Sequence, residues 1–132
     1  MPRKPVDILH VEDDDDDADL MSRALSRTGV NHVLIRVADA TEAITYLTNQ
    51  PRPDLVLLDL KLPRVNGFDV LAFIRAKPEL QGLPVIVFTG SEFPNDMEKA
   101  KALGATDYLL KNVDWKVAAM ALQASFSQFL QI

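Results

Sequence analysis

Short apolar segments recur along the chain, and most of them end in a polar side chain. The clearest is Leu55–Leu58, four consecutive apolar residues that are followed by Asp59. An apolar run of this length predicts a strand that is buried on both faces. Four further runs predict strands, namely residues 6–11 before Glu12 and Asp13, residues 33–37, residues 85–88 before Thr89, and residues 108–110 before Lys111.

Between these runs, apolar residues recur at the three- and four-residue spacing that predicts helices. The expected stripes are Leu20, Met21, Ala24 and Leu25; Ala40, Ala43, Ile44 and Leu47; Phe68, Leu71, Ala72, Ile74 and Arg75; Met97, Ala100 and Leu103; and Ala118, Ala121, Leu122, Ser125, Phe126 and Phe129. Residues that favour helix ends flank these stripes. The predicted ends are Gly29 and Gly104 as stops, Asp39 with Glu42 as a capping box, Asn95 or Asp96 as the start of the fourth helix, and Asp114 as the start of the last.

Strands therefore alternate with helices five times, which is typical of an α/β fold with a parallel sheet and helices on both faces. The predicted architecture is a three-layer, doubly wound (βα)5 domain over residues 1–132, although the pattern alone leaves the strand order open. In such sheets the carboxyl ends of the strands form the binding edge. We therefore expect Glu12, Asp13, Asp59, Thr89 and Lys111 to lie near one another.

The turn after the first strand is acidic where nucleotide-binding folds carry glycines. Residues 12–17 are six consecutive acids, and these would repel a phosphate rather than cradle it. Carboxylates at this place favour a hard cation such as Mg²⁺. Asp15, Asp16 and Asp17 are interpreted as a solvated helix start, since acids favour the first turn. The glycine and glutamate spacing of a calcium EF-hand does not fit.

A metal, a fixed ammonium, a hydroxyl and an aspartate together suit phosphoryl transfer to a carboxylate. In this hypothesis Asp59 is the nucleophile, Lys111 holds phosphoryl oxygens and Thr89 donates a hydrogen bond. The two histidines are given structural roles. His10 is expected to be a buried histidine with satisfied hydrogen bonds, and His32 a surface residue before the second strand.

Composition narrows the class of protein. The chain has 132 residues, 48% hydrophobic and 25% charged, with a formal net charge of -5 and no cysteine. These values are typical of one globular domain, exclude a disulfide scaffold and disfavour non-specific nucleic-acid binding. No apolar run is long enough for a signal peptide or a membrane span, so a cytoplasmic protein without membrane attachment is expected.

The residues at the strand ends carry a family resemblance that covers the chain from about Val6 to Phe126. The motifs are Val11-Glu12-Asp13-Asp14, Leu58-Asp59-Leu60-Lys61-Leu62-Pro63 with Asn66-Gly67, Val87-Phe88-Thr89-Gly90, and Gly104-Ala105-Thr106-Asp107-Tyr108-Leu109-Leu110-Lys111. The sequence resembles the CheY-like receiver domain of two-component response regulators. The resemblance implies a flavodoxin-like sheet of order 2-1-3-4-5.

It also implies roles for single residues. Asp59 would be the phosphoacceptor, taking a phosphoryl group from the phosphohistidine of a sensor histidine kinase. The domain would promote its own phosphorylation and dephosphorylation without being a turnover enzyme. Asp13 and Asp59 would bind Mg²⁺ directly, the backbone carbonyl of Lys61 would be a third ligand, and Glu12 would act through water.

The same resemblance assigns a switch. Thr89 and Lys111 would contact the phosphoryl group, and Tyr108 would turn inward when Thr89 is drawn to it. The fourth helix, fifth strand and fifth helix would then form the output face, for a downstream protein, a phosphotransfer partner or a homodimer. Trp115 is the residue proposed for such an interface.

Some features depart from the family pattern or narrow it. Asn112 follows Lys111 where the family usually has a proline after a cis peptide bond. This difference affects the loop conformation and therefore the direction of the Lys111 side chain. Lys61 and Ser91 occupy positions that tune phosphoryl lifetime. The sequence has no output domain after the last helix, so a stand-alone receiver is expected. Residues 79–85 and 126–130 are similar to small receivers paired with phytochrome-type kinases.

Three other functions remain as alternatives. An aspartyl phosphatase or hydrolase would usually carry an acid two residues after the nucleophile, where this chain has Lys61. A flavin or nucleotide binder of the same fold is disfavoured by the acidic first loop. A receiver that signals by contacts alone would not require the full set of site residues.

Overall fold

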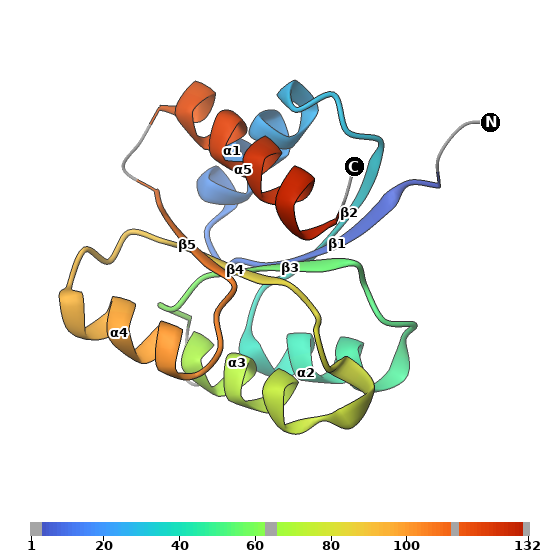
Figure 1. Ribbon diagram of the computed structural model, residues 1–132, viewed down its shortest axis with the longest axis vertical. Helices are drawn as coiled ribbons and strands as arrows, with labels where there is room; N and C mark the ends of the chain where they lie inside the picture. Colours follow the sequence, from blue (N-terminus) through green and yellow to red (C-terminus); the bar gives the residue numbers. More distant parts are fainter. Residues whose placement is uncertain (1–3, 63–65, 112–113, 131–132) are drawn as a thin grey trace.

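The computed structural model describes residues 4–62, 66–111 and 114–130. Strands and helices alternate along the chain, with one short 3-10 helix before the fourth strand (Figure 1). The elements are β1 (Val6–Val11), α1 (Asp15–Arg27), β2 (His32–Val37), α2 (Ala40–Asn49), β3 (Leu55–Leu58), α3 (Gly67–Ala76), η1 (Pro78–Leu80), β4 (Val85–Thr89), α4 (Pro94–Ala102), β5 (Asp107–Leu110) and α5 (Trp115–Phe129).

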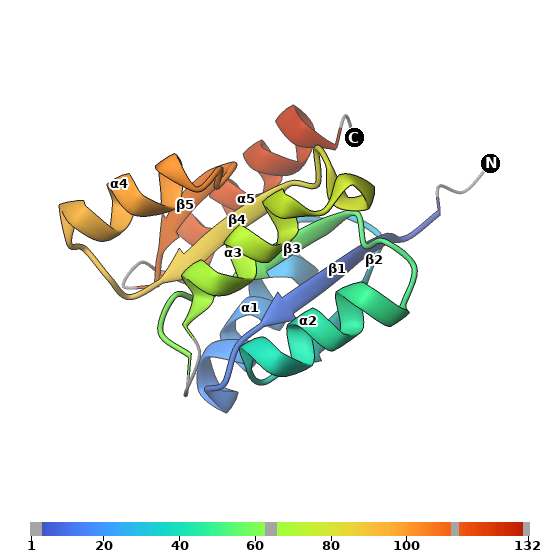
Figure 2. The ribbon, with the colours of Figure 1, turned by 90° about the horizontal axis from the view of Figure 1, so that it is seen from below.

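The five strands form one parallel sheet of order β2-β1-β3-β4-β5. Helices α1 and α5 cover one face, and α2, α3 and α4 cover the other, which gives three layers (Figures 1 and 2). The predicted doubly wound, flavodoxin-like fold and its strand order are confirmed. In this order β1 pairs with β3 and β3 with β4, so the carboxyl ends of the three strands lie next to one another.

A small apolar cluster forms around Leu60, Val87 and Ala100, and two larger ones hold the layers together, one on each face of the sheet. Alternate residues of β1 and β3 divide between them, because successive side chains of a strand point to opposite faces. Leu9 and Leu58 pack with α2 and α3, whereas Ile8 and Leu57 pack with α1 and α5. All four residues of β3 are buried, as its uninterrupted apolar sequence predicts.

Local signals set the ends of the first two helices. The Asp14 side chain accepts a hydrogen bond from the Asp17 backbone N–H at 3.0 Å and caps α1. Gly29 follows the end of α1 with a φ of 74°, a left-handed conformation that favours glycine. In α2 the Asp39 side chain accepts from the Glu42 backbone N–H at 2.8 Å, as the capping-box pattern predicts.

The start of α4 and the place of His32 differ from the predictions, and β4 and β5 are each one residue longer than predicted. Helix α4 begins at Pro94 with Phe93 as its N-cap, not at Asn95 or Asp96, because proline is well suited to the first helical position. His32 is the half-buried first residue of β2 instead of a surface residue before it, and its ring Nδ1 lies 2.8 Å from the Val30 carbonyl oxygen.

The expected helical stripes are buried unequally. Met97 is 41% exposed and Ala72 is exposed, while Phe129 is only half-buried. Helix α4 buries Ala100 alone, so it lies against the sheet more loosely than its spacing predicts. Among the helices that the structure describes, none combines the length and apolarity needed to cross a membrane.

Candidate functional site

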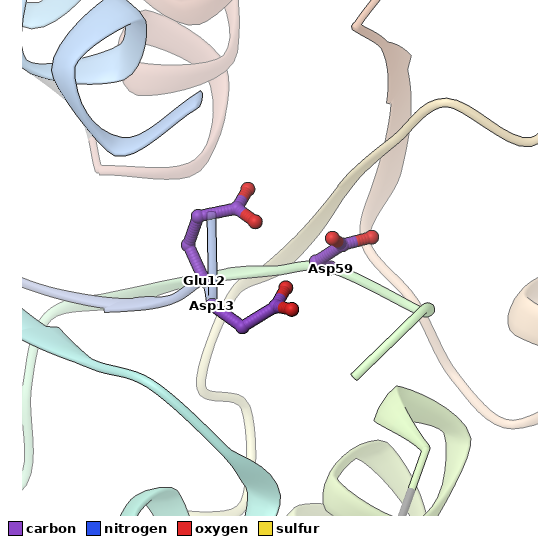
Figure 3. A group of neighbouring side chains, drawn as sticks. All are labelled: Glu12, Asp13 and Asp59. Carbon is purple, nitrogen blue, oxygen red and sulfur yellow. The ribbon is translucent and has the colours of Figure 1, made fainter. Parts of the chain in front are cut away.

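The acids at the ends of β1 and β3 converge on one place. Glu12 and Asp13 follow β1 directly, and Asp59 follows β3. The Asp59 backbone N–H donates to the Val11 carbonyl at 3.1 Å. One carboxylate oxygen from each acid lies within 4.8 Å of the other two. Figure 3 shows the three carboxylates beyond the strand ends. Glu12 and Asp59 are buried, whereas Asp13 is exposed, so the cluster is open on one side.

Lys111, at the end of β5, brings its ammonium group into this cluster. Its Nζ lies 2.7 Å from Glu12 Oε1, 2.8 Å from Asp59 Oδ2 and 2.9 Å from Asp17 Oδ2. Burial alone would lower the pKa of Lys111, but the hydrogen bonds to these carboxylates outweigh it and raise the pKa. The ammonium therefore stays charged. It donates hydrogen bonds to Asp17 and Asp59 and forms a close ion pair with Glu12.

Asp17 is a site residue that the sequence interpretation missed. Residues 15 and 16 are exposed, as a solvated helix start predicts, but Asp17 is half-buried and contacts Lys111. A signal was present in the sequence. Asp17 precedes buried Met21 by four residues, and positions four apart share a face of a helix.

Glu12 is fully buried, and this burial disfavours the charged form of its carboxylate. Burial raises the pKa of Glu12 to about 7, and the Lys111 ammonium limits the rise. Its other oxygen accepts from the Asp14 backbone N–H at 3.3 Å. The carboxylate thus titrates in the neutral range unless a further positive charge joins the cluster.

Thr89 and Tyr108 are connected through the loop after β4. The Thr89 hydroxyl is fully buried and accepts from the Ser91 backbone N–H at 3.4 Å. The Tyr108 hydroxyl donates to the Ser91 carbonyl at 3.0 Å, and Ser91 Oγ donates to Asp96 of α4 at 2.5 Å. Burial raises the pKa of the Tyr108 phenol, so it remains a hydrogen-bond donor. Ser91 therefore connects the strand end to α4 and β5.

The remaining predicted residues lie as follows. The Lys61 backbone N–H donates to Asp59 Oδ1 at 3.1 Å, and its side chain is exposed. Trp115 is half-buried at the start of α5, with the Arg27 guanidinium carbon 4.8 Å from its ring centroid. Pro63 and Asn112 lie outside the described residues.

His10 does not have the hydrogen bonds expected of it. It is 1% exposed, and within the described part of the chain neither ring nitrogen makes a hydrogen bond. Its Nε2 lies 4.0 Å from Glu12 Oε1, which Lys111 contacts more closely. Burial, followed by the positive charges of Lys111 and Arg36, lowers the pKa of His10 to about 3.

His10→Leu is expected to stabilise the fold, by about 1 kcal/mol near pH 8, because it removes an unpaired buried polar group. Between pH 6.5 and about 3 the unfolded chain binds a proton on His10 that the folded chain does not. The wild type therefore loses stability as pH falls through this range, and the advantage of the variant should grow by about 1.4 kcal/mol per pH unit. Glu12 titrates in both proteins, so its effect cancels in the comparison.

Urea unfolding of both proteins in EDTA between pH 5 and 8 measures this difference. Val11→Ala, which shortens a buried apolar side chain on the same strand, should destabilise the fold by an amount that does not change with pH. A constant difference between His10→Leu and wild type across the range would contradict the titration argument.

Known proteins share the sequence pattern and the fold of this chain. The family model of the response regulator receiver domain matches residues 8–123. Response regulator Rcp1 of a Synechocystis species is 35% identical over 133 residues, which cover 96% of this chain and 90% of Rcp1.

Solved structures show the same relationship. The phosphorylated cyanobacterial phytochrome response regulator RcpA superposes with a TM-score of 0.84 at 32% identity, covering 96% of this chain and 95% of RcpA. The Mn²⁺-bound form of Rcp1 gives 0.83 at 34% identity and covers 97% of both chains. The receiver domain of the Pseudomonas aeruginosa kinase PA1611, with magnesium in its active-site cleft, gives 0.82 at 26% identity, covering 98% and 100%. By sequence and by structure, this chain belongs to the response regulator receiver domain family.

Proposed function

We propose that this receiver domain accepts a phosphoryl group on Asp59 from the phosphohistidine of a sensor histidine kinase. The observation that carries the proposal is the buried Asp59 carboxylate, 4% exposed as a residue and 2.8 Å from the Lys111 ammonium. It lies beside two further acids at the open edge of the sheet. A buried carboxylate in contact with a fixed cation suits a nucleophile that must gain a charged group.

The transfer balances without further reactants. An Asp59 carboxylate oxygen forms a bond to phosphorus, and the bond from phosphorus to the histidine nitrogen breaks with its electron pair left on the nitrogen. Lys111 offsets charge on the phosphoryl oxygens. Thr89, whose hydroxyl is buried at the end of the neighbouring β4, donates a hydrogen bond to one of them.

The acids also fit a divalent cation. Three carboxylates with ligand atoms within 4.8 Å of one another form the oxygen donor set that Mg²⁺ prefers. Asp13, Asp59 and the Lys61 carbonyl would hold the ion directly, and Glu12 would hold it through water. Bound there, Mg²⁺ would offset the charge of the acids and of the phosphoryl group.

We further propose that phosphorylation is read out at α4, β5 and α5. Thr89 is connected to Tyr108 through Ser91, so a hydroxyl drawn toward the phosphoryl group would release the tyrosine. The similarity to the cyanobacterial phytochrome response regulator RcpA supports a phytochrome-type kinase as the phosphodonor. The downstream partner would be a protein, a phosphotransfer domain or a second copy of this chain, with Trp115 at the interface.

Phosphorylation by acetyl phosphate tests the proposed function, with intact mass as the readout. With Mg²⁺ we expect one phosphoryl adduct that is stable in acid and lost in base. Without Mg²⁺, or with EDTA, we expect none, because the crowded acids of the site would repel an anionic donor. Sedimentation before and after the reaction would show whether the dimer forms. An adduct that is independent of Mg²⁺ would contradict the proposed site.

A further inference from the structure

The contact between Asp17 and Lys111 connects the start of α1 to the end of β5. Asp17 Oδ2 lies 2.9 Å from Lys111 Nζ, although the two residues are 94 positions apart. The Lys111 side chain is 12% exposed and that of Asp17 is 34% exposed. The pair is therefore partly shielded from solvent, and it is screened less than a surface ion pair.

The Lys111 ammonium would remain in the acidic cluster without Asp17. Two acids with side chains no more than 5% exposed, Glu12 and Asp59, already contact its ammonium at 2.7 and 2.8 Å. The third carboxylate adds negative charge instead. Around one ammonium there are three formal negative charges, and Asp13 stands beside them. The phosphoryl group proposed for Asp59 would add still more.

We propose that Asp17 is a positioning residue that slows phosphoryl exchange at Asp59 by engaging one N–H donor of the Lys111 ammonium. The inference rests on the proposed function of Asp59. Lys111 has three N–H donors, and the one that faces Asp17 is withheld from phosphoryl oxygens. The Asp17 carboxylate also repels an anionic phosphodonor that approaches the same cation. Both effects raise the barrier to phosphoryl uptake and to phosphoryl loss, since both transition states place charge on the same oxygens.

The neighbouring acids do not share this contact. Asp14 caps α1 with its side chain, and Asp15 pairs with Arg36 at 2.7 Å. Asp16 is exposed. Asp17 alone in this first turn meets Lys111, so a change of charge at position 17 should act differently from the same change at position 16.

The test compares Asp17→Asn with wild type at saturating Mg²⁺. Asparagine keeps the shape of the side chain and the backbone N–H that Asp14 accepts from, and it removes the charge. We expect the rate of uptake from acetyl phosphate to rise roughly three- to tenfold, the range for a partly shielded ion pair. After the donor is removed, the phosphoryl group should be lost faster by a similar factor.

Two further variants separate the contact from general charge. Asp16→Asn removes one charge from the same turn and should leave both rates within about twofold of wild type. Asp17→Glu retains a carboxylate that reaches Lys111 and should restore slow exchange, which a merely structural role for position 17 would not require.

The outcomes separate this inference from the function on which it rests. Uptake in wild type, with the same rate in Asp17→Asn or an equal acceleration in Asp16→Asn, would overturn the role of Asp17 and leave the function standing. No uptake in wild type would overturn the function, and the role of Asp17 with it. Faster uptake and faster loss confined to Asp17→Asn would establish it.

Discussion

Replacing Asp59 with asparagine is expected to abolish phosphoryl uptake from acetyl phosphate. The amide nitrogen and oxygen of asparagine cannot form the acyl phosphate that a carboxylate forms. The surroundings should change little, because asparagine has nearly the same shape and Lys111 retains contacts with Glu12 and Asp17. A missing adduct would therefore report the loss of the nucleophile and not of the fold.

Intact mass after reaction with Mg²⁺ and acetyl phosphate measures this effect. Asp69→Asn provides the matched control, since Asp69 is an exposed aspartate in the first turn of α3. It should take up one phosphoryl group as wild type does. Undiminished uptake in Asp59→Asn would move the phosphoacceptor to another residue and remove the basis of the proposed function.

Gly67→Ala is expected to lower the free energy of unfolding by about 3 kcal/mol, the second large effect. Gly67 is buried at the start of α3, and its N–H donates to the Leu60 carbonyl at 2.9 Å. A Cβ at this position would overlap the Asp59 carbonyl oxygen and lie 2.8 Å from the Leu60 Cα. Both obstacles are backbone atoms, which cannot swing aside as a flexible side chain does.

The same substitution should slow phosphoryl uptake by about tenfold or more, because the chain that must move carries Asp59. Urea unfolding followed by circular dichroism measures the stability, and intact mass measures the uptake. Gly90→Ala is the control: a Cβ at Gly90 meets nothing within 4 Å, so a change within about 0.5 kcal/mol is expected. Equal destabilisation by both variants would show that the close approach at Gly67 is unimportant.

The fold could be predicted because its signals are local and repeated. Leu55–Leu58 is apolar throughout and is buried throughout, and alternation with helical stripes is enough to indicate a parallel sheet. The acids at the ends of β1 and β3 were predicted to meet because parallel strands bring their carboxyl ends to one edge. Glu12, Asp13, Asp59 and Lys111 do meet there.

The features that the sequence interpretation missed depend on contacts between distant residues. The ion pair of Asp17 with Lys111 depends on the tertiary fold, which brings the start of α1 close to the end of β5. The sequence pattern suggested only a solvated acidic turn. His10 was expected to have a partner, yet Lys111 takes the nearby Glu12 carboxylate. At α4 two favourable cap residues competed with Pro94, and the preference of proline for the first helical turn decided the boundary.

The strand order has a consequence for how easily different parts of the domain open. Strands β3 and β4 lie inside the sheet and are buried along their whole length, and Asp59 and Thr89 lie at their carboxyl ends. By contrast, α4 buries one residue, and β5 at the edge of the sheet has no fully buried residue. Local opening of a protein requires the least free energy where few apolar contacts are buried.

Amide hydrogen exchange should therefore be slower in β3 and β4 than in α4 and β5. The residues proposed for phosphoryl transfer, Asp59 and Thr89, therefore lie at the ends of strands that open rarely. The proposed readout includes α4 and β5, which bury few residues, so a small change at Thr89 would be enough to shift their conformations.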